Sequence, residues 1–157
     1  MLRRALLAWS TIREETGLVA IALAPMGLEL PPLTLLTNKG AVVTLSTKTT
    51  AFFLQKKAIP LKRALVQASY QKNRAKMEAL IASTFRLLTS MREAGIVDRD
   101  GALIRNGNLG VLQGKVILLD IGKIEKSSNK MSQTMKDIER LRPLYHWLFS
   151  FHQELVP

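Results

Sequence analysis

The stretch Leu109-Gly-Val-Leu-Gln-Gly-Lys-Val-Ile-Leu-Leu-Asp120 decides the fold of this 157-residue chain. Two apolar runs, 109–112 and 116–120, flank the dipeptide Gln113-Gly114. Short apolar runs separated by a Gly-containing turn are typical of a β-hairpin, with the middle of the second run deep in the protein. The sequence therefore predicts a buried hairpin over residues 109–120.

Polar residues stand at both ends of this hairpin. Asp98-Arg-Asp100 precedes it, Asn106-Gly-Asn108 leads directly into it, and Asp120 closes it two residues before Gly122. Burying a bare carboxylate is costly, so an Asp that ends an apolar strand is expected to face a cation, backbone donors or solvent. Mg²⁺ prefers oxygen ligands, and one Asp with one Asn carboxamide would suit it. The same residues also suit an ordinary hairpin that ends in a polar turn.

The segments around the hairpin are predicted to be helical. Helical spacing of apolar residues indicates helices over about 61–70, 75–94 and 132–152, with Gly95 ending the second and Pro143 bending the third. The apolar stripe of the first comprises Leu61, Ala64, Leu65 and Ala68. The stripe of the second comprises Met77, Leu80, Ile81, Thr84, Leu87, Leu88 and Met91.

The N-terminal part of the chain is predicted to be a helix followed by a small antiparallel sheet. A helix over residues 1–16 would end at Gly17. Its expected apolar stripe is Leu2, Leu6, Leu7, Trp9 and Ile12. Apolar runs bounded by turn residues then predict strands over 18–24, 33–37, 41–45 and 51–55, with Asn38-Lys-Gly40 as the turn between the middle two.

These elements predict an α+β fold in one domain, residues 1–157. Residues 1–55 would form the first helix and the small sheet, and residues 56–157 a mainly helical body with the hairpin 109–120. The length is enough to bury a substantial core.

Composition excludes several classes of protein. There is no Cys, which rules out disulfides and thiolate metal sites and is typical of a reducing compartment. No apolar run approaches the roughly 18 residues of a membrane-spanning helix. We therefore expect a cytoplasmic protein, and the sequence does not indicate its oligomeric state.

The net charge of +11 is concentrated in the N-terminal half. Residues 1–77 contain 12 Lys and Arg and 3 Glu, and the segment 56–76 contains seven basic residues and no acid. Such a field attracts an anionic partner, namely a nucleotide, a nucleic acid or an acidic protein, although it also serves solubility. The candidate phosphate-binding or anion-binding residues are Lys56, Lys57, Lys62 and Arg63.

The segment 98–122 resembles the catalytic loop and metal-binding hairpin of protein-kinase-like enzymes. By this resemblance Asp120-Ile-Gly122 matches the Asp-Phe-Gly element, and Asn108, with Asn106 as the alternative, matches the metal-binding Asn. The base role would fall on Asp98 or Asp100. The resemblance implies the lower lobe of such a fold, with Mg²⁺ and ATP as possible ligands.

The chain as a whole is also similar to an uncharacterised family of chlamydia-like bacteria, which implies no activity. The shared residues are Arg13-Glu-Glu-Thr16, Phe53-Leu-Gln-Lys-Lys-Ala58, Gly95-Ile-Val-Asp-Arg-Asp100, Asn108-Leu-Gly110 and Asp120-Ile-Gly122.

The chain departs from the kinase pattern upstream. It has no Gly-rich phosphate loop and no Val-Ala-Ile-Lys-like strand, so Glu14 or Glu15 would have no lysine partner. The resemblance therefore implies a degenerate or truncated kinase-like domain with at most weak binding of Mg-nucleotide or phosphate. Whether it is an enzyme stays open, and if active it would be a phosphotransferase. The alternative is a basic binding module for nucleic acid or an acidic protein partner.

Overall fold

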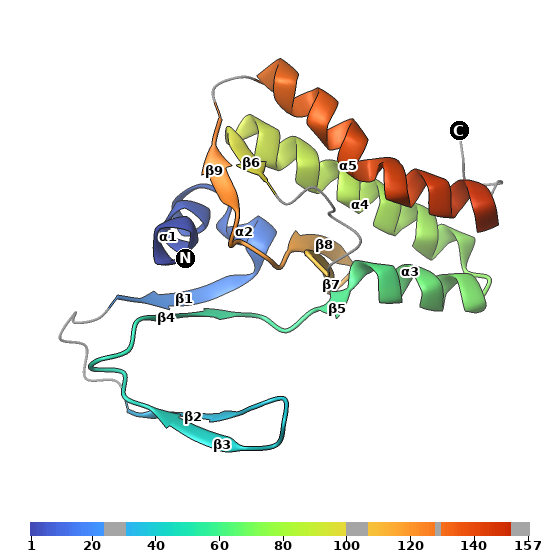
Figure 1. Cartoon of the computed structure of the whole chain (residues 1–157). Helices are drawn as coiled ribbons and strands as arrows, with labels where there is room; N and C mark the ends of the chain where they lie inside the picture. Colours follow the sequence, from blue (N-terminus) through green and yellow to red (C-terminus); the bar gives the residue numbers. More distant parts are fainter. Residues whose placement is uncertain (24–30, 100–106, 128–129, 152–157) are drawn as a thin grey trace.

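The computed structural model describes residues 1–23, 31–99, 107–127 and 130–151 (Figure 1). The helices are α1 (Leu2–Thr11), α2 (Arg13–Thr16), α3 (Leu61–Tyr70), α4 (Arg74–Glu93) and α5 (Lys130–Phe151). The strands are β1 (Leu18–Ala22), β2 (Leu33–Leu36), β3 (Val42–Leu45), β4 (Phe52–Gln55), β5 (Ile59–Pro60), β6 (Ile96–Asp98), β7 (Leu109–Leu112), β8 (Lys115–Leu118) and β9 (Ile124–Lys126). Helices and small antiparallel sheets confirm the predicted α+β class.

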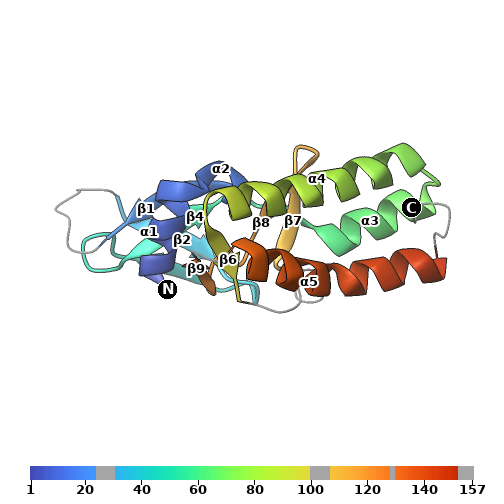
Figure 2. The ribbon, with the colours of Figure 1, turned by 90° about the horizontal axis from the view of Figure 1, so that it is seen from above.

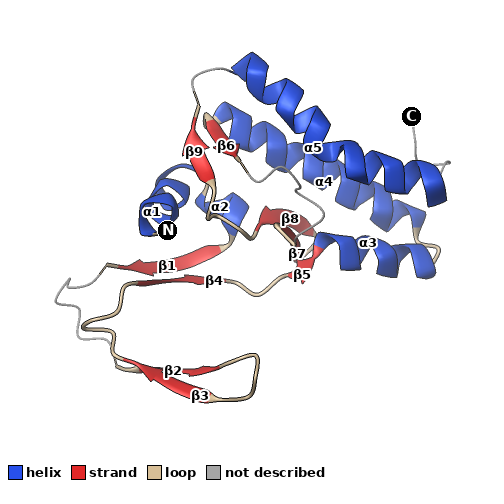
Figure 3. Cartoon of the chain, in the orientation of Figure 1, coloured by secondary structure: helices blue, strands red, loops and turns tan. Residues whose placement is uncertain are grey.

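Helices α3, α4 and α5 lie side by side, and α4 contacts both of the others (Figures 2 and 3). The four residues of the α3 stripe are all buried, as the sequence predicts. Every residue of the α4 stripe is buried as well, except Ile81, which is half-buried. Asn73 begins α4 because its side-chain Oδ1 accepts a hydrogen bond from the N–H of Lys76 at 2.9 Å.

The predicted hairpin is confirmed, with a boundary correction. Strands β7 and β8 pair antiparallel from Leu109–Leu118 at the open end to Leu112–Lys115 at the turn. Gln113 and Gly114 form the turn with positive φ angles of 50° and 81°. Strand β8 ends at Leu118, so Asp120 lies two residues beyond it rather than at its end.

The single N-terminal sheet expected from the sequence is two separate pairs of strands. Strand β1 pairs with β4, and β2 pairs with β3 in a hairpin that projects from the body of the molecule (Figure 1). Strands β2 and β3 lie between β1 and β4 in the sequence. Within the described residues, β2 and β3 pair only with each other.

The predicted N-terminal helix is broken at Ile12, whose φ of −137° and ψ of 39° are not helical. Its expected apolar stripe is also wrong in part, because Ala5 and Ala8 are buried with Ile12 whereas Leu6 is 41% exposed. The small Ala side chains let α1 approach β1, β4 and β9 closely. The large apolar residues alone therefore missed Ala5 and Ala8, the two fully buried positions of α1, and wrongly included Leu6.

Three short strands were not predicted from the sequence. Strand β5 pairs with β7, and β6 pairs with β9. The amide side chain of Gln55 connects the N-terminal segment to strand β8, because its Nε2 donates to Thr16 O at 2.6 Å and to Leu118 O at 3.0 Å.

Among the described residues, no helix has the length and apolar character needed to cross a membrane.

Candidate functional site

Asp98 lies at the end of β6 in the interior. It is 1% exposed, and its backbone is opposite Ile124 in the β6–β9 pair. The next residue, Arg99, donates its N–H to Lys123 O at 3.1 Å. The candidate base is therefore held against the segment that follows Asp120.

Asn108 and Asp120 meet at the open end of the β7–β8 hairpin. The carbonyl oxygen of Asn108 accepts hydrogen bonds from the N–H of Leu119 at 2.6 Å and from the N–H of Asp120 at 3.4 Å. Asn108 is 2% exposed, whereas Asp120 is exposed. The backbones of the two candidate metal ligands are thus in direct contact.

The residues after Asp120 form a compact turn. Asp120 Oδ1 accepts a hydrogen bond from the N–H of Gly122 at 2.7 Å, which is the local bond that Asp side chains make in turns. The carbonyl of Gly122 in turn accepts a hydrogen bond from Arg4 Nη1 of α1. The N-terminal helix therefore contributes to the position of this turn.

The donor types at this turn suit Mg²⁺, although the protein ligands are few. Carboxylate and carboxamide oxygens are hard ligands, and Mg²⁺ is often bound by one or two carboxylates together with substrate phosphates. The part of the chain that the structure describes contains no group of three or more His, Cys, Asp or Glu able to hold a metal. A cation here would thus depend on phosphate oxygens for most of its coordination.

The other candidates are divided between described and undescribed parts of the chain. Asp100 and the alternative ligand Asn106 lie outside the described residues. Lys56, Lys57, Lys62 and Arg63 are all exposed, the first two between β4 and β5 and the last two in the first turn of α3.

Lys56 alone of these four lines a cleft of about 600 Å³ between the N-terminal segment and the β7–β8 turn. The charged side chains that line this cleft are Arg13, Glu14, Lys56 and Lys115. A second cleft, of about 460 Å³, is also lined by Lys115, together with Glu15 and Arg86. The sequence did not single out Arg13 or Lys115 as binding residues, because they meet only through the fold.

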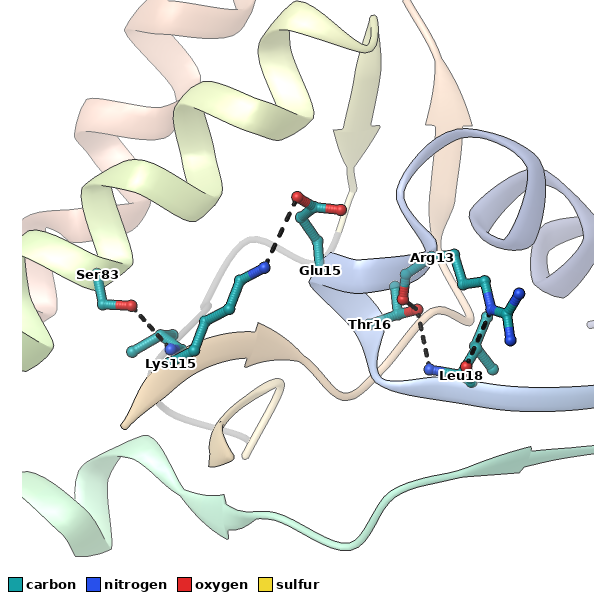
Figure 4. Close-up of polar contacts among 7 residues, drawn as sticks. Arg13, Glu15, Thr16, Leu18, Ser83 and Lys115 are labelled. Atoms are coloured by element: carbon teal, nitrogen blue, oxygen red, sulfur yellow. Dashed lines mark hydrogen bonds and ion pairs between the residues drawn. The ribbon is translucent and has the colours of Figure 1, made fainter. Parts of the chain in front are cut away.

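Glu15, which was expected to have no lysine partner, lies near Lys115. The Nζ of Lys115 lies 4.0 Å from Glu15 Oε1 (Figure 4). The adjacent backbone N–H, of Val116, donates to Ser83 Oγ of α4 at 2.8 Å. The base of the Lys115 side chain is therefore fixed, while its end reaches towards α2.

Comparison of the chain with protein-family models, with curated proteins and with solved structures gives no match.

Proposed function

We propose that this chain is a degenerate kinase-like lower-lobe domain that binds the phosphates of a Mg-nucleotide weakly at the open end of the β7–β8 hairpin. This site, called the 108–122 turn below, consists of Asn108 and the turn Asp120–Gly122 and excludes the hairpin between them. The observation that carries the proposal is the backbone contact between Asn108 and Asp120 at the open end of the hairpin. It holds a carboxamide residue beside an exposed carboxylate, the pair that the resemblance assigns to the metal. Bound Mg²⁺ would supply positive charge to neutralise the phosphates.

Burial assigns different tasks to Asp120 and Asp98. Asp120 is exposed and would contact the cation directly, with one carboxylate oxygen engaged by Gly122. Asp98 is almost fully buried, so in this proposal it positions the β6–β9 segment and takes no proton from a substrate. With an exposed carboxylate for the metal and a buried Asp98, the domain would bind a nucleotide without efficient catalysis. This is what is meant here by a degenerate kinase-like domain.

The proposal includes a cytoplasmic location. Mg²⁺ and nucleotides are the ligands it requires, and the absence of Cys is typical of proteins in a reducing compartment.

A thermal-stability measurement with Mg-ATP tests the site. A ligand at about 100 times its Kd stabilises the folded state by roughly 2.7 kcal/mol, a shift of several degrees in Tm for a domain of this size. Asp120→Asn keeps an oxygen that can accept the Gly122 hydrogen bond but removes the charge, so we expect the Mg-dependent shift to vanish. The matched control is Glu78→Gln, which removes one negative charge from the exposed face of α4 and should leave the shift intact.

A shift that is independent of Mg²⁺, or equal in the parent and Asp120→Asn, would contradict a metal–phosphate site at this turn.

A second candidate function is non-specific binding of a polyanion. The exposure of Lys57, Lys62 and Arg63 on a segment without acidic residues favours it. Contacts from Lys and Arg to phosphates release counterions, so affinity for single-stranded DNA would fall steeply as salt rises. Lys62→Glu with Arg63→Glu should abolish this binding and Asp120→Asn should not; a reversal of these two results would contradict it.

A further inference from the structure

We propose that the cleft lined by Arg13, Lys56 and Lys115 is a second site, which binds a small molecule carrying two or more phosphate groups. It is separate from the 108–122 turn, because the two lie at opposite ends of the β7–β8 hairpin. Leu112–Lys115 is the pair next to the hairpin turn, and Leu109–Leu118 is the pair next to Asn108. The cleft includes the turn residue Gln113 but neither Asn108 nor Asp120.

The charges that line the cleft favour an anion. Three cationic side chains come from α2, from the segment after β4 and from the start of β8, and one carboxylate, that of Glu14, opposes them. A concave site lined by one predominant sign of charge concentrates ligands of the opposite sign. A volume of about 600 Å³ is in the range of small-molecule sites.

Arg13 is held in place before any ligand arrives. Its Cζ lies 3.7 Å from the centroid of the Trp9 ring, in a cation–π contact. Its Nε faces Leu18 O at 3.5 Å, a bond that leaves the two terminal nitrogens of the guanidinium out of the interaction (Figure 4). Because a planar guanidinium forms paired bonds with phosphate, a fixed Arg13 loses little entropy on binding.

Lys56 is fixed to the same segment through its backbone. Its N–H donates to Gly17 O at 2.9 Å. Gly17 has a φ of 65°, and a Cβ there would lie 3.0 Å from Ile117 Cδ1 and 3.8 Å from Lys56 Cβ. The glycine therefore lets the two walls of the cleft approach each other, which places Lys56 and the hairpin around one space.

Lys115 completes the set from the hairpin side. Its side chain is 51% exposed, and its 4.0 Å approach to Glu15 is a loose ion pair. A surface pair of this kind contributes little, so its loss on ligand binding costs little. A phosphate oxygen can accordingly compete with Glu15 for the ammonium group.

The apolar part of the wall defines the rest of the ligand. Leu18, Leu112 and Ile117 line the cleft between the cations. Apolar walls with a few placed charges are typical of small-molecule sites rather than of a track for a nucleic-acid backbone. The site would thus take a compact phosphorylated molecule.

Trp9 provides a direct signal for this site, since it contacts Arg13. The chain has two Trp, so Trp147→Phe leaves Trp9 as the single reporter of fluorescence. We expect titration with inorganic pyrophosphate, without Mg²⁺, to change Trp9 emission and to saturate. Lys56→Gln and Lys115→Gln should each raise the Kd by about tenfold or more, the size expected for one charge-assisted hydrogen bond.

Two control variants distinguish binding in this cleft from general attraction to the positive charge of the protein and from binding at the 108–122 turn. Lys39→Gln removes an exposed charge from the β2–β3 turn and should leave the Kd unchanged. Asp120→Asn should also leave it unchanged, whatever that variant does to Mg-ATP binding. An absence of saturation would overturn the proposal, as would an equal loss of affinity in Lys39→Gln and Lys56→Gln or a loss in Asp120→Asn.

Discussion

Ser83 joins α4 to the β7–β8 hairpin through one buried hydrogen bond. Its Oγ accepts from Val116 N at 2.8 Å, and both residues are buried. Ser83→Ala would leave the Val116 N–H buried without this acceptor, at a cost of about 1–3 kcal/mol in the free energy of unfolding. Urea denaturation measures the change.

Ser90→Ala is the matched control, since Ser90 lies on the same helix but is only half-buried. We expect it to change stability by less than about 0.5 kcal/mol, because surface substitutions have small effects. Equal effects of the two substitutions would show that helix propensity, and not the bond to Val116, determines the result.

The neighbours of Gly110 in β7 leave no room for a larger side chain. A Cβ added there would lie 2.7 Å from Leu119 Cδ1 and 2.9 Å from Ala58 Cβ. We expect Gly110→Ala to destabilise the protein by about 1–3 kcal/mol, since overpacking forces neighbouring atoms to move. Combining it with Leu119→Ala should cost less than the two single changes added together, because one of the two clashes is relieved. Additive values of the free energy of unfolding would contradict the contact.

At the scale of elements, the sequence predicted the parts whose pattern is local. The stripes of α3 and α4 repeat every three or four residues, and so their buried faces could be read directly. Strands β5, β6 and β9 have only two or three residues each, and their partners lie far away in the chain, as in the pair Ile59–Val111. No local pattern of that length identifies a strand.

The two proposed binding sites differ in how far their residues could be predicted from local sequence. The Asp and Asn residues of the 108–122 turn are close in sequence and flank a recognisable hairpin, so a local motif could indicate them. Arg13, Lys56 and Lys115 come from three distant segments and form a cleft only after folding. Of these three, only Lys56 was predicted, as part of the basic segment 56–76. Nothing in the sequence neighbourhoods of Arg13 and Lys115 distinguishes them from other surface cations.

The β2–β3 hairpin has apolar side chains that its own fold does not cover. Leu36 and Val42 are cross-strand partners and are 75% and 67% exposed. We expect Leu36→Thr with Val42→Thr to change the free energy of unfolding by less than about 0.5 kcal/mol per site, because little buried area is lost and Thr suits a strand. Urea denaturation measures this change, and Leu65→Thr, at a buried position of α3, should by contrast cost several times more. A loss above about 1 kcal/mol per site in the hairpin variant would show that these side chains support the fold.

The whole molecule carries a large excess of positive charge. The pairs Arg74–Glu78, Arg99–Glu125 and Glu15–Lys115 of the described residues are all partly exposed. Exposed pairs contribute little, whereas a net charge of +11 favours unfolding through self-repulsion. Raising NaCl shortens the screening length from about 30 Å at 0.01 M to about 8 Å at 0.15 M. We therefore expect the free energy of unfolding in urea to rise over this range.

Two charge reversals test whether repulsion is the cause. Lys39→Glu with Lys76→Glu, both at exposed positions, lowers the net charge by four, from +11 to +7. This variant should be more stable than the parent at 0.01 M NaCl and should gain less from added salt. Binding of an anion in the cleft of Arg13, Lys56 and Lys115 would give a different result. Because the two substitutions leave this cleft unchanged, pyrophosphate should then stabilise the parent and the variant equally. If added salt instead lowers the free energy of unfolding of the parent, attraction within ion pairs outweighs repulsion between the positive charges. That result would contradict the prediction.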